Sequence, residues 1–195
     1  MRIVAKALGL VLVLLLGGCL VESENTLAEP DPKVKDDKLV GTWYSAEGGE
    51  VVMFQVAADE TGSGTYRAVY VAVRAGGEKA VEFEQYNVWL TAVGGQTYLN
   101  VVRTGGTGTS PKTMIVAYDF GTDGTLVVRL MDTKFTAAAV DAGKLKGRVK
   151  KGQYVDEVTI TASRAELVAF IASAKRDELF ASKTGALHKL PDTKK

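Results

Sequence analysis

The stretch Leu39-Val40-Gly41-Thr42-Trp43-Tyr44-Ser45 is the first of seven short runs rich in β-branched and aromatic residues. Short links that contain glycine separate the runs, and no helical segment lies between them. The other runs cover residues 51–58, 65–74, 80–93, 97–103, 113–120 and 125–131. Because a parallel pair of strands needs a long crossover, short links between β-rich runs predict antiparallel hairpins. The sequence therefore predicts an antiparallel meander.

The alternation of side chains within the runs indicates how this sheet buries its surface. In the third run, Tyr66 and Tyr70 alternate with Val69 and Val71, so both faces of the strand are partly apolar. One face can line an interior while the other lies under a covering element. An open sheet would also leave two edges exposed. We therefore expect a closed, up-and-down β-barrel.

Helices are expected after these main strands. Asp132 can cap a helix over residues 133–142 that Gly143 ends. Ser163 and Glu166 fit a capping box before a second amphipathic helix. The expected fold is therefore mainly β, with one or two helices packed after the main strands.

Two short strands and one charged stretch complete this part of the chain. Strands are predicted at residues 157–161 and 186–190. The alternating basic residues of 144–150 indicate a charged sheet edge or a solvated loop. A contact with anionic lipid headgroups is the alternative for this basic stretch.

The N-terminal residues have the pattern of an export signal. Arg2 and Lys6 precede an apolar run at 7–16, and the small residues Gly17 and Gly18 follow it. A basic region, an apolar core and a small-residue cleavage site in this order are typical of secretion. A transmembrane helix needs about 20 apolar residues, so a permanent span is the weaker interpretation.

The stretch Leu16-Gly17-Gly18-Cys19 contains the only cysteine of the chain. It resembles the lipobox of bacterial lipoproteins. The resemblance implies that residues 1–18 are a lipoprotein signal peptide, and that Cys19 carries a covalent diacylglycerol and an N-acyl chain such as palmitate. A thiolate is the strongest nucleophile available for this alkylation. The alternative is an ordinary secretory cleavage site beside a cysteine buried in the core.

The same resemblance implies a location. Leu20, rather than an aspartate, follows the cysteine, and in Gram-negative lipoproteins such a residue goes with export to the outer membrane. We therefore expect a lipid-anchored protein of the bacterial cell envelope, on the periplasmic face of the outer membrane if the source is Gram-negative. Residues 19–37 are rich in acidic residues and proline, and such a stretch buries too little apolar surface to order itself. We expect a flexible leash there, followed by a domain at 38–195.

Residues 39–44 resemble the Gly-x-Trp opening of lipocalins and lipocalin-like domains, with Gly41 and Trp43 in the matching positions. In these families the tryptophan closes one end of an antiparallel barrel, and a basic side chain of the last strand often packs over its ring. The resemblance implies this role for Lys189, with Arg129 as the second candidate. The Thr-Asp-x-Tyr type of motif is absent, and two helices are expected where lipocalins usually show one. A lipocalin-like β-barrel is therefore expected rather than a true lipocalin.

The composition excludes several classes of function. The formal net charge of the chain is +1, and without residues 1–18 it has 22 basic and 23 acidic residues, so no nucleic-acid partner is indicated. With one cysteine and one histidine, His188, the chain has no disulfide framework and no thiolate or multi-histidine metal site. We expect no cofactor besides the acyl groups at Cys19.

No arrangement of residues indicates catalysis. The stretch 104–113 is similar to a phosphate-binding loop, but Pro111 stands where that pattern has glycine and no helix follows, which favours a hairpin. His188 has no nucleophile or acid at a recognisable spacing. Glu82 and Glu84 share one side of a strand, where a solvated face is a simpler interpretation than a pair of catalytic carboxylates. We therefore expect a protein that is not an enzyme.

Four aromatic residues on the predicted strands indicate a binding function. Tyr70, Phe83, Tyr86 and Trp89 can line an interior that holds an acyl chain or a ring, because ligand pockets are mostly apolar. The first hypothesis is a membrane-anchored lipoprotein that binds a small hydrophobic or amphipathic ligand in its barrel. The alternative is a structural lipoprotein whose barrel is filled by its own side chains and whose surface binds another envelope protein.

Overall fold

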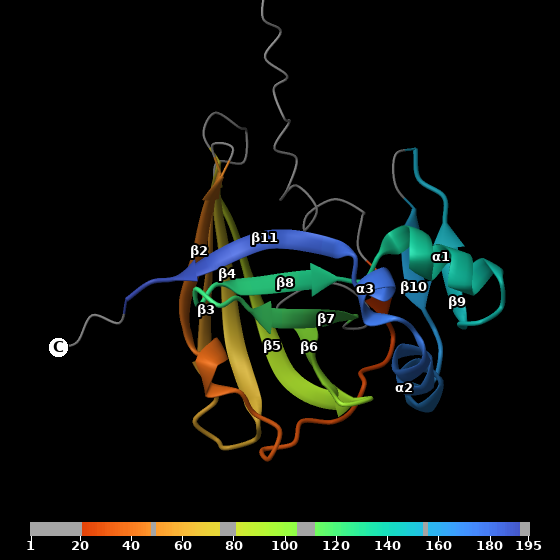
Figure 1. Cartoon of the computed structure of the whole chain (residues 1–195), viewed down its shortest axis with the longest axis horizontal. Helices are drawn as coiled ribbons and strands as arrows, with labels where there is room; N and C mark the ends of the chain where they lie inside the picture. The colour runs from red at the N-terminus through yellow and green to blue at the C-terminus, as the bar shows by residue number, and fades with distance from the viewer. Residues whose placement is uncertain (1–20, 48–49, 75–80, 105–111, 154–155, 192–195) are drawn as a thin grey trace, which may run out of the picture.

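Eight strands form a closed barrel in the computed structural model, which describes residues 21–47, 50–74, 81–104, 112–153 and 156–191 (Figure 1). The strands are β2 (Gly41–Glu47), β3 (Glu50–Ala58), β4 (Thr65–Arg74), β5 (Val81–Val93), β6 (Gln96–Thr104), β7 (Thr113–Phe120), β8 (Leu126–Leu130) and β11 (Ser182–Lys189). All neighbours pair antiparallel, and β11 closes the barrel between β8 and β2. The prediction of a closed antiparallel barrel is confirmed.

The last barrel strand is longer than the sequence predicts. It starts at Ser182 rather than at residue 186, because a register shift between Lys183 and Ala186 lets it continue along β8. Gly185 lies within this irregularity with a φ of 92°, a conformation that glycine adopts at little cost. β11 therefore pairs with β8 from Ser182 to Leu187, and its last two residues pair with Tyr44 and Trp43 of β2.

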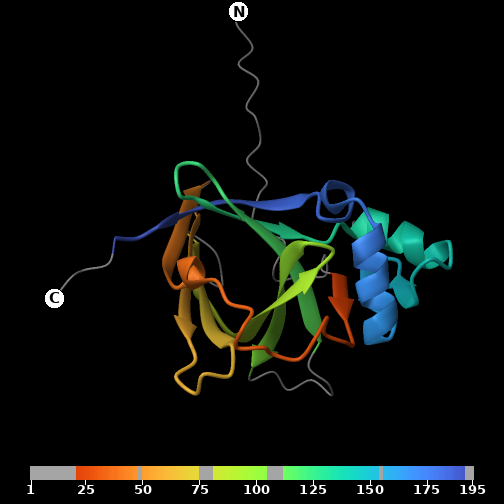
Figure 2. The same ribbon diagram turned by 60° about the horizontal axis from the view of Figure 1, so that its bottom comes forward.

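The chain between β8 and β11 forms an insert against one side of the barrel (Figure 2). It contains α1 (Thr133–Asp141), β9 (Gly147–Lys150), β10 (Glu157–Ile160), α2 (Arg164–Ser173) and α3 (Arg176–Leu179). Both predicted caps are present: Asp132 accepts a hydrogen bond from the Phe135 N–H at 2.8 Å, and Ser163 forms a capping box with Glu166. The single-turn helix α3 was not predicted from the sequence.

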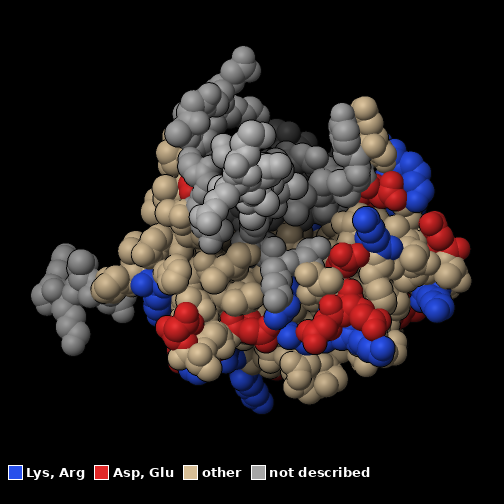
Figure 3. All heavy atoms as spheres, turned by 45° about the horizontal axis from the view of Figure 1, so that its top comes forward, with Lys and Arg blue, Asp and Glu red and all other residues tan. Residues whose placement is uncertain are grey.

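The basic stretch at 144–150 includes β9, the edge strand of the sheet. Its side chains pair with carboxylates: Lys146 with Glu166, Arg148 with Glu24 and Lys150 with Glu157, at N–O distances of 2.6, 2.6 and 3.1 Å. Blue and red side chains accordingly lie close together on the right of Figure 3. A charged sheet edge of this kind discourages pairing with other chains, and the carboxylates leave little net positive charge for lipid headgroups.

The segment expected to be a flexible leash is packed on the domain instead. Strand β1 (Val21–Ser23) pairs in parallel with β10, and Ser23 also pairs with Thr113 of β7. Val21 and Leu27 are 5% and 2% exposed. The leash prediction is therefore wrong for residues 21–37, because strands from other parts of the chain supply the partners that this polar segment lacks by itself.

Among the side-chain hydrogen bonds that hold the segment after β1, two involve buried side chains of β5 and β6. The Leu27 N–H donates to Oδ1 of Asn100 at 2.7 Å, and Asn100 is completely buried. The indole Nε1 of Trp89 donates to the Ala28 carbonyl, also at 2.7 Å. A buried amide that lost its backbone partner would be costly, so these contacts specify the path of the segment across the barrel.

The two faces of the barrel sheet contribute to two apolar cores. The inner core includes Trp43, Tyr70 and Leu90. The outer core lies between β5–β7 and the insert, and includes Ile115 and Phe180. The prediction that both faces of the sheet bury apolar side chains is thus confirmed.

Candidate ligand-binding cavity

Trp43 and a short 3-10 helix close one end of the barrel. Trp43 is 1% exposed, and its Nε1 donates to the Leu39 carbonyl at 2.9 Å. Leu39 is buried at the end of the helix η2 (Asp37–Leu39), which leads into β2. The Trp43 ring also packs on Phe120, with the ring centroids 5.9 Å apart. Because the backbone carbonyl satisfies the indole, the tryptophan can be buried there without an unpaired donor.

Lys189 lies over the Trp43 ring. Its Nζ is 5.4 Å from the ring centroid, and the two residues are directly opposite in the pairing of β11 with β2. Gly41 leaves room for this contact, because a β carbon at that position would lie 2.5 Å from Cε of Lys189. The structure thus brings together Gly41, Trp43 and Lys189. Arg129 pairs with Asp119 instead, at 3.0 Å.

Replacement of Gly41 by alanine is expected to destabilise the fold. Gly41 has a φ of 133°, so alanine must adopt a strained backbone conformation and also displace Lys189. We expect a loss of about 1–3 kcal/mol in the free energy of unfolding, measured by urea denaturation. Gly62→Ala is the matched control, because Gly62 also has a positive φ, 70°, but its β carbon would meet nothing within 4 Å. Equal losses in the two variants would mean that the Lys189 contact adds nothing.

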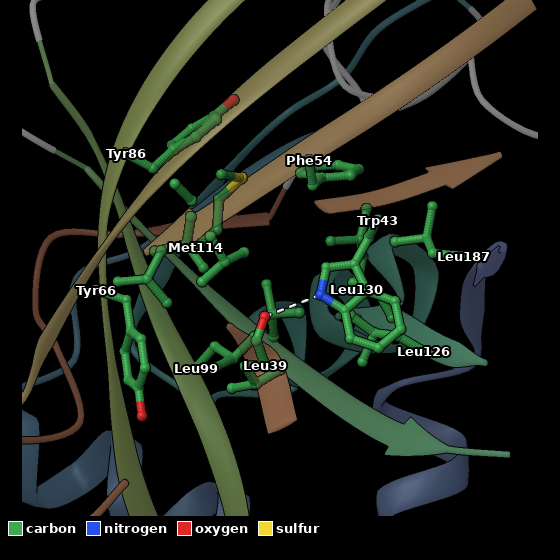
Figure 4. A pocket seen from close by; sticks show the side chains of 16 residues that line it. Leu39, Trp43, Phe54, Tyr66, Tyr86, Leu99, Met114, Leu126, Leu130 and Leu187 are labelled. Carbon is green, nitrogen blue, oxygen red and sulfur yellow. Dashed lines mark hydrogen bonds between the residues drawn. The ribbon is translucent and has the colours of Figure 1, made fainter. Parts of the chain in front are cut away.

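An apolar cavity of about 110 Å³ lies inside the barrel next to this closed end (Figure 4). Side chains from η2 and from all eight barrel strands line it, and most of them are aliphatic. They are Leu39, Trp43, Phe54, Val56, Tyr66, Ala68, Tyr86, Val88, Leu99, Val101, Met114, Val116, Leu126, Val128, Leu130 and Leu187.

The polar side-chain atoms of this lining are bonded to other groups. Trp43 donates to Leu39, as the dashed line in Figure 4 shows. The Tyr66 hydroxyl accepts from the Asp36 N–H at 2.9 Å, and the Tyr86 hydroxyl donates to Glu84. A site of this kind suits an apolar group better than water, which needs two to four polar partners.

A polar pair lies beside the cavity on the same face of β5 and β6. Glu84 is two residues from Tyr86, and Arg103 is two residues from Val101, so all four side chains share one face of the sheet. The Glu84 carboxylate is 2.7 Å from Nη2 of Arg103. Burial, together with the neighbouring Glu84, raises the pKa of the Tyr86 hydroxyl, which therefore remains a donor. The side chain of Arg103 is 50% exposed, so the pair borders solvent.

The structure separates the four aromatic residues that the sequence analysis grouped as possible lining. Tyr86 lines the cavity. Tyr70 is completely buried beyond it and packs on Phe54, with ring centroids 5.1 Å apart. Phe83 and Trp89 lie on the outer face of β5, where Phe83 is 60% exposed and Trp89 contacts the N-terminal segment. Their assignment to the lining is a mistake of alternation, because Phe83 and Trp89 have odd positions and Tyr86 an even one.

Most of the cavity wall, including Leu99 and Met114, was not predicted from the sequence. Both belong to strands that were predicted correctly, and each shares an alternation with other lining residues of its strand, Val101 and Val116 respectively. The signal was therefore present as a period of two. The face that points inward became clear only from the pairing of each strand with its neighbours.

The other sequence candidates do not form a site among the described residues. His188 lies beside Tyr44, with ring centroids 5.9 Å apart. Within the described ranges no group of three or more His, Cys, Asp or Glu side chains could hold a metal ion. No helix in the part of the chain that the structure describes is long and apolar enough to cross a bilayer. Cys19 and Pro111 of the loop lie outside the described residues.

We compared the chain with protein-family models, with curated proteins and with solved structures, and found no significant match. The fold and the cavity alone therefore define the class of protein. It is an eight-stranded antiparallel β-barrel with one closed end and an apolar interior cavity.

Proposed function

We propose that this protein is a non-enzymatic, lipid-anchored binding module of the bacterial cell envelope. Its barrel binds a small hydrophobic ligand, or the apolar end of an amphipathic one, and acyl groups at Cys19 attach it to the membrane. The observation that carries the binding function is the cavity, whose lining is apolar and whose few polar atoms are bonded elsewhere. The lipobox resemblance and the Gly-x-Trp resemblance support the anchoring and the lipocalin-like character.

The size of the cavity limits the ligand. At about 110 Å³ it is somewhat smaller than the engineered apolar cavity of about 150 Å³ that binds benzene. It is well below the roughly 300–1,000 Å³ of pockets that enclose a drug-sized molecule. The ligand is therefore a small ring or a short apolar segment, unless flexible lining side chains such as Met114 move aside.

The polar pair beside the cavity favours an amphipathic ligand. Glu84 and Arg103 present an acceptor and a donor next to each other, and Arg103 reaches solvent. An apolar segment in the cavity would place its polar end near this pair. A few polar groups beside an apolar pocket fix the orientation of a ligand, and hydrogen bonds to charged groups are stronger than those between neutral groups.

The small volume also favours a second candidate function. A barrel of eight strands can be filled by its own side chains, and then the protein would be a structural lipoprotein whose outer surface binds another envelope protein. The two functions differ in whether the interior admits any molecule.

Benzene binding separates the two functions. We expect benzene to shift the methyl resonances of lining residues, Met114 among them, in NMR spectra of the acylated protein in detergent micelles. Ala68→Leu places three more carbon atoms in the cavity, so less room is left for benzene. We expect benzene binding to weaken by at least about tenfold, which corresponds to a loss of about 1.4 kcal/mol of binding free energy.

Ala138→Leu is the matched control. Ala138 is exposed on α1, so the substitution adds the same three carbon atoms away from the cavity. It is expected to bind benzene as the parent protein does. Circular dichroism verifies that both variants fold. A parent protein whose methyl resonances do not respond to benzene would favour the filled barrel and the structural function.

A further inference from the structure

The outer face of the barrel has an exposed apolar patch at one end of β3, β4 and β5. Exposed fractions there are 41% for Val51, 40% for Val73, 62% for Val81 and 60% for Phe83. Val73 pairs with both Val51 and Val81, and Val71 pairs with both Met53 and Phe83. Two complete cross-strand rows are therefore apolar. We refer to these six residues as the apolar rim.

The apolar character is confined to this end of the strands. The next row along the same face consists of Gln55, Val69 and Gln85, and the row after it of Ala57, Arg67 and Asn87. Residues two apart on a strand are separated by roughly 7 Å, so the surface changes from apolar to polar within one or two rows. Contiguous exposed apolar patches on soluble proteins mark surfaces that contact a partner or a membrane.

The position of Cys19 indicates which of these contacts the rim makes. Strand β1 begins at Val21 and is fixed in the sheet by β10 and β7. Each residue spans at most about 3.6 Å, so Cys19 lies within about 7 Å of the Val21 backbone. Acyl chains on Cys19 would therefore hold the domain directly against the bilayer.

The strand ends that carry the rim and the start of β1 are directed toward the same side of the molecule. Val21 pairs with Val158 near the start of β10, and the start of β10 points to the top of Figure 1. The ends of β3, β4 and β5 that carry the rim point to the top of the same view. A bilayer that receives the acyl chains from Cys19 would thus meet the rim as well.

We propose that the apolar rim inserts into the surface of the bilayer to which Cys19 is anchored. This inference rests on the anchoring in the proposed function, but not on the cavity. Two rows of side chains span roughly 7 Å along the strands, which matches the penetration of about 5–10 Å that interfacial elements reach. The next two rows, which contain Gln55 and Arg67, then lie at the level of the headgroups and of water.

Spin labelling of the acylated full chain in phosphatidylcholine vesicles tests this proposal. An acylated Cys19 has no free thiol, so one introduced cysteine is the single labelling site. Phe83→Cys places a nitroxide in the rim, and Asn87→Cys places one on the same strand and face, two rows away. We expect the ratio of oxygen to nickel-complex collision rates to be at least about fivefold higher at residue 83 than at residue 87, as for an immersed label.

Vesicle flotation, measured in the same samples, distinguishes a failure of the lipid anchor from a failure of the rim contact. If the protein floats with the vesicles but the collision-rate ratio at residue 83 is that of a label in water, the rim contact is overturned and the anchor stands. Protein that does not float would overturn the anchor, and the rim contact with it. Spin–spin broadening at residue 83 would show that a second copy of the chain covers the rim, which also overturns the proposal. Thermal unfolding identical to that of the parent shows that each variant is folded.

Discussion

Cys19→Ser is expected to abolish fatty-acid labelling of the protein completely. Serine has no thiolate, and the thiolate is the nucleophile that the attachment of diacylglycerol requires. Cells fed an alkyne analogue of palmitate would show the label on the parent protein and only background on the variant. Intact mass spectrometry would show the parent without residues 1–18 and heavier by its acyl groups.

The loss of the acyl groups would also release the protein from the membrane, because the burial of acyl chains is what anchors it. Each buried methylene contributes about 0.8 kcal/mol, one myristoyl-length chain binds a membrane only marginally, and two or three chains anchor it stably. Gly18→Ala is the matched control, because alanine is also small and leaves the cysteine in place. Unchanged fatty-acid labelling of Cys19→Ser would refute the lipobox interpretation.

The barrel could be predicted from the sequence because the patterns that specify its strands and turns lie within short stretches of the chain. The seven runs of β-rich residues correspond to β2 to β8, and each of these strands pairs antiparallel with the next one along the chain. Asp132 and Ser163 cap the helices that they were expected to cap. Such features depend on neighbours within a few residues, which a sequence displays directly.

The parts that were not predicted depend on contacts between distant residues. The face of β5 that points inward is set by its pairing with β4 and β6, so the sequence analysis grouped Trp89 with Tyr86 although they face opposite sides. Lys189 over Trp43 came from the Gly-x-Trp resemblance. Composition alone would not have placed them together, because they are far apart in the sequence and meet only when β11 closes the barrel.

The N-terminal segment shows the same limit most clearly. Its composition is that of a solvated leash, and only Val21 and Leu27 are buried in the outer core. The order of strands gives these residues their importance, because β1 lies between β7 of the barrel and β10 of the insert. A segment with few apolar residues therefore joins the strands of the insert to those of the barrel.

A chain that begins at Lys38 is consequently expected to be far less stable than the full protein. The truncation removes the burial of Val21 and Leu27, and each fully buried side chain of this type contributes about 1.5–3 kcal/mol. It also exposes Val158 and Ile160 of β10, which are 1% and 0% exposed in the full protein. Since whole domains are stable by only about 5–15 kcal/mol, we expect the truncated chain to lose a large part of its free energy of unfolding in urea.

Point variants in the full chain show whether the loss comes from packing. Leu27→Ala is expected to cost about 2–5 kcal/mol, because the leucine side chain is buried in the outer core. Lys33→Ala, at an exposed position of the same segment, is expected to change stability by less than about 0.5 kcal/mol. If Leu27→Ala and the truncated chain both unfolded at the urea concentration of the parent, residues 21–37 would be a leash, and the short distance from Cys19 to the barrel would no longer hold the domain against the membrane.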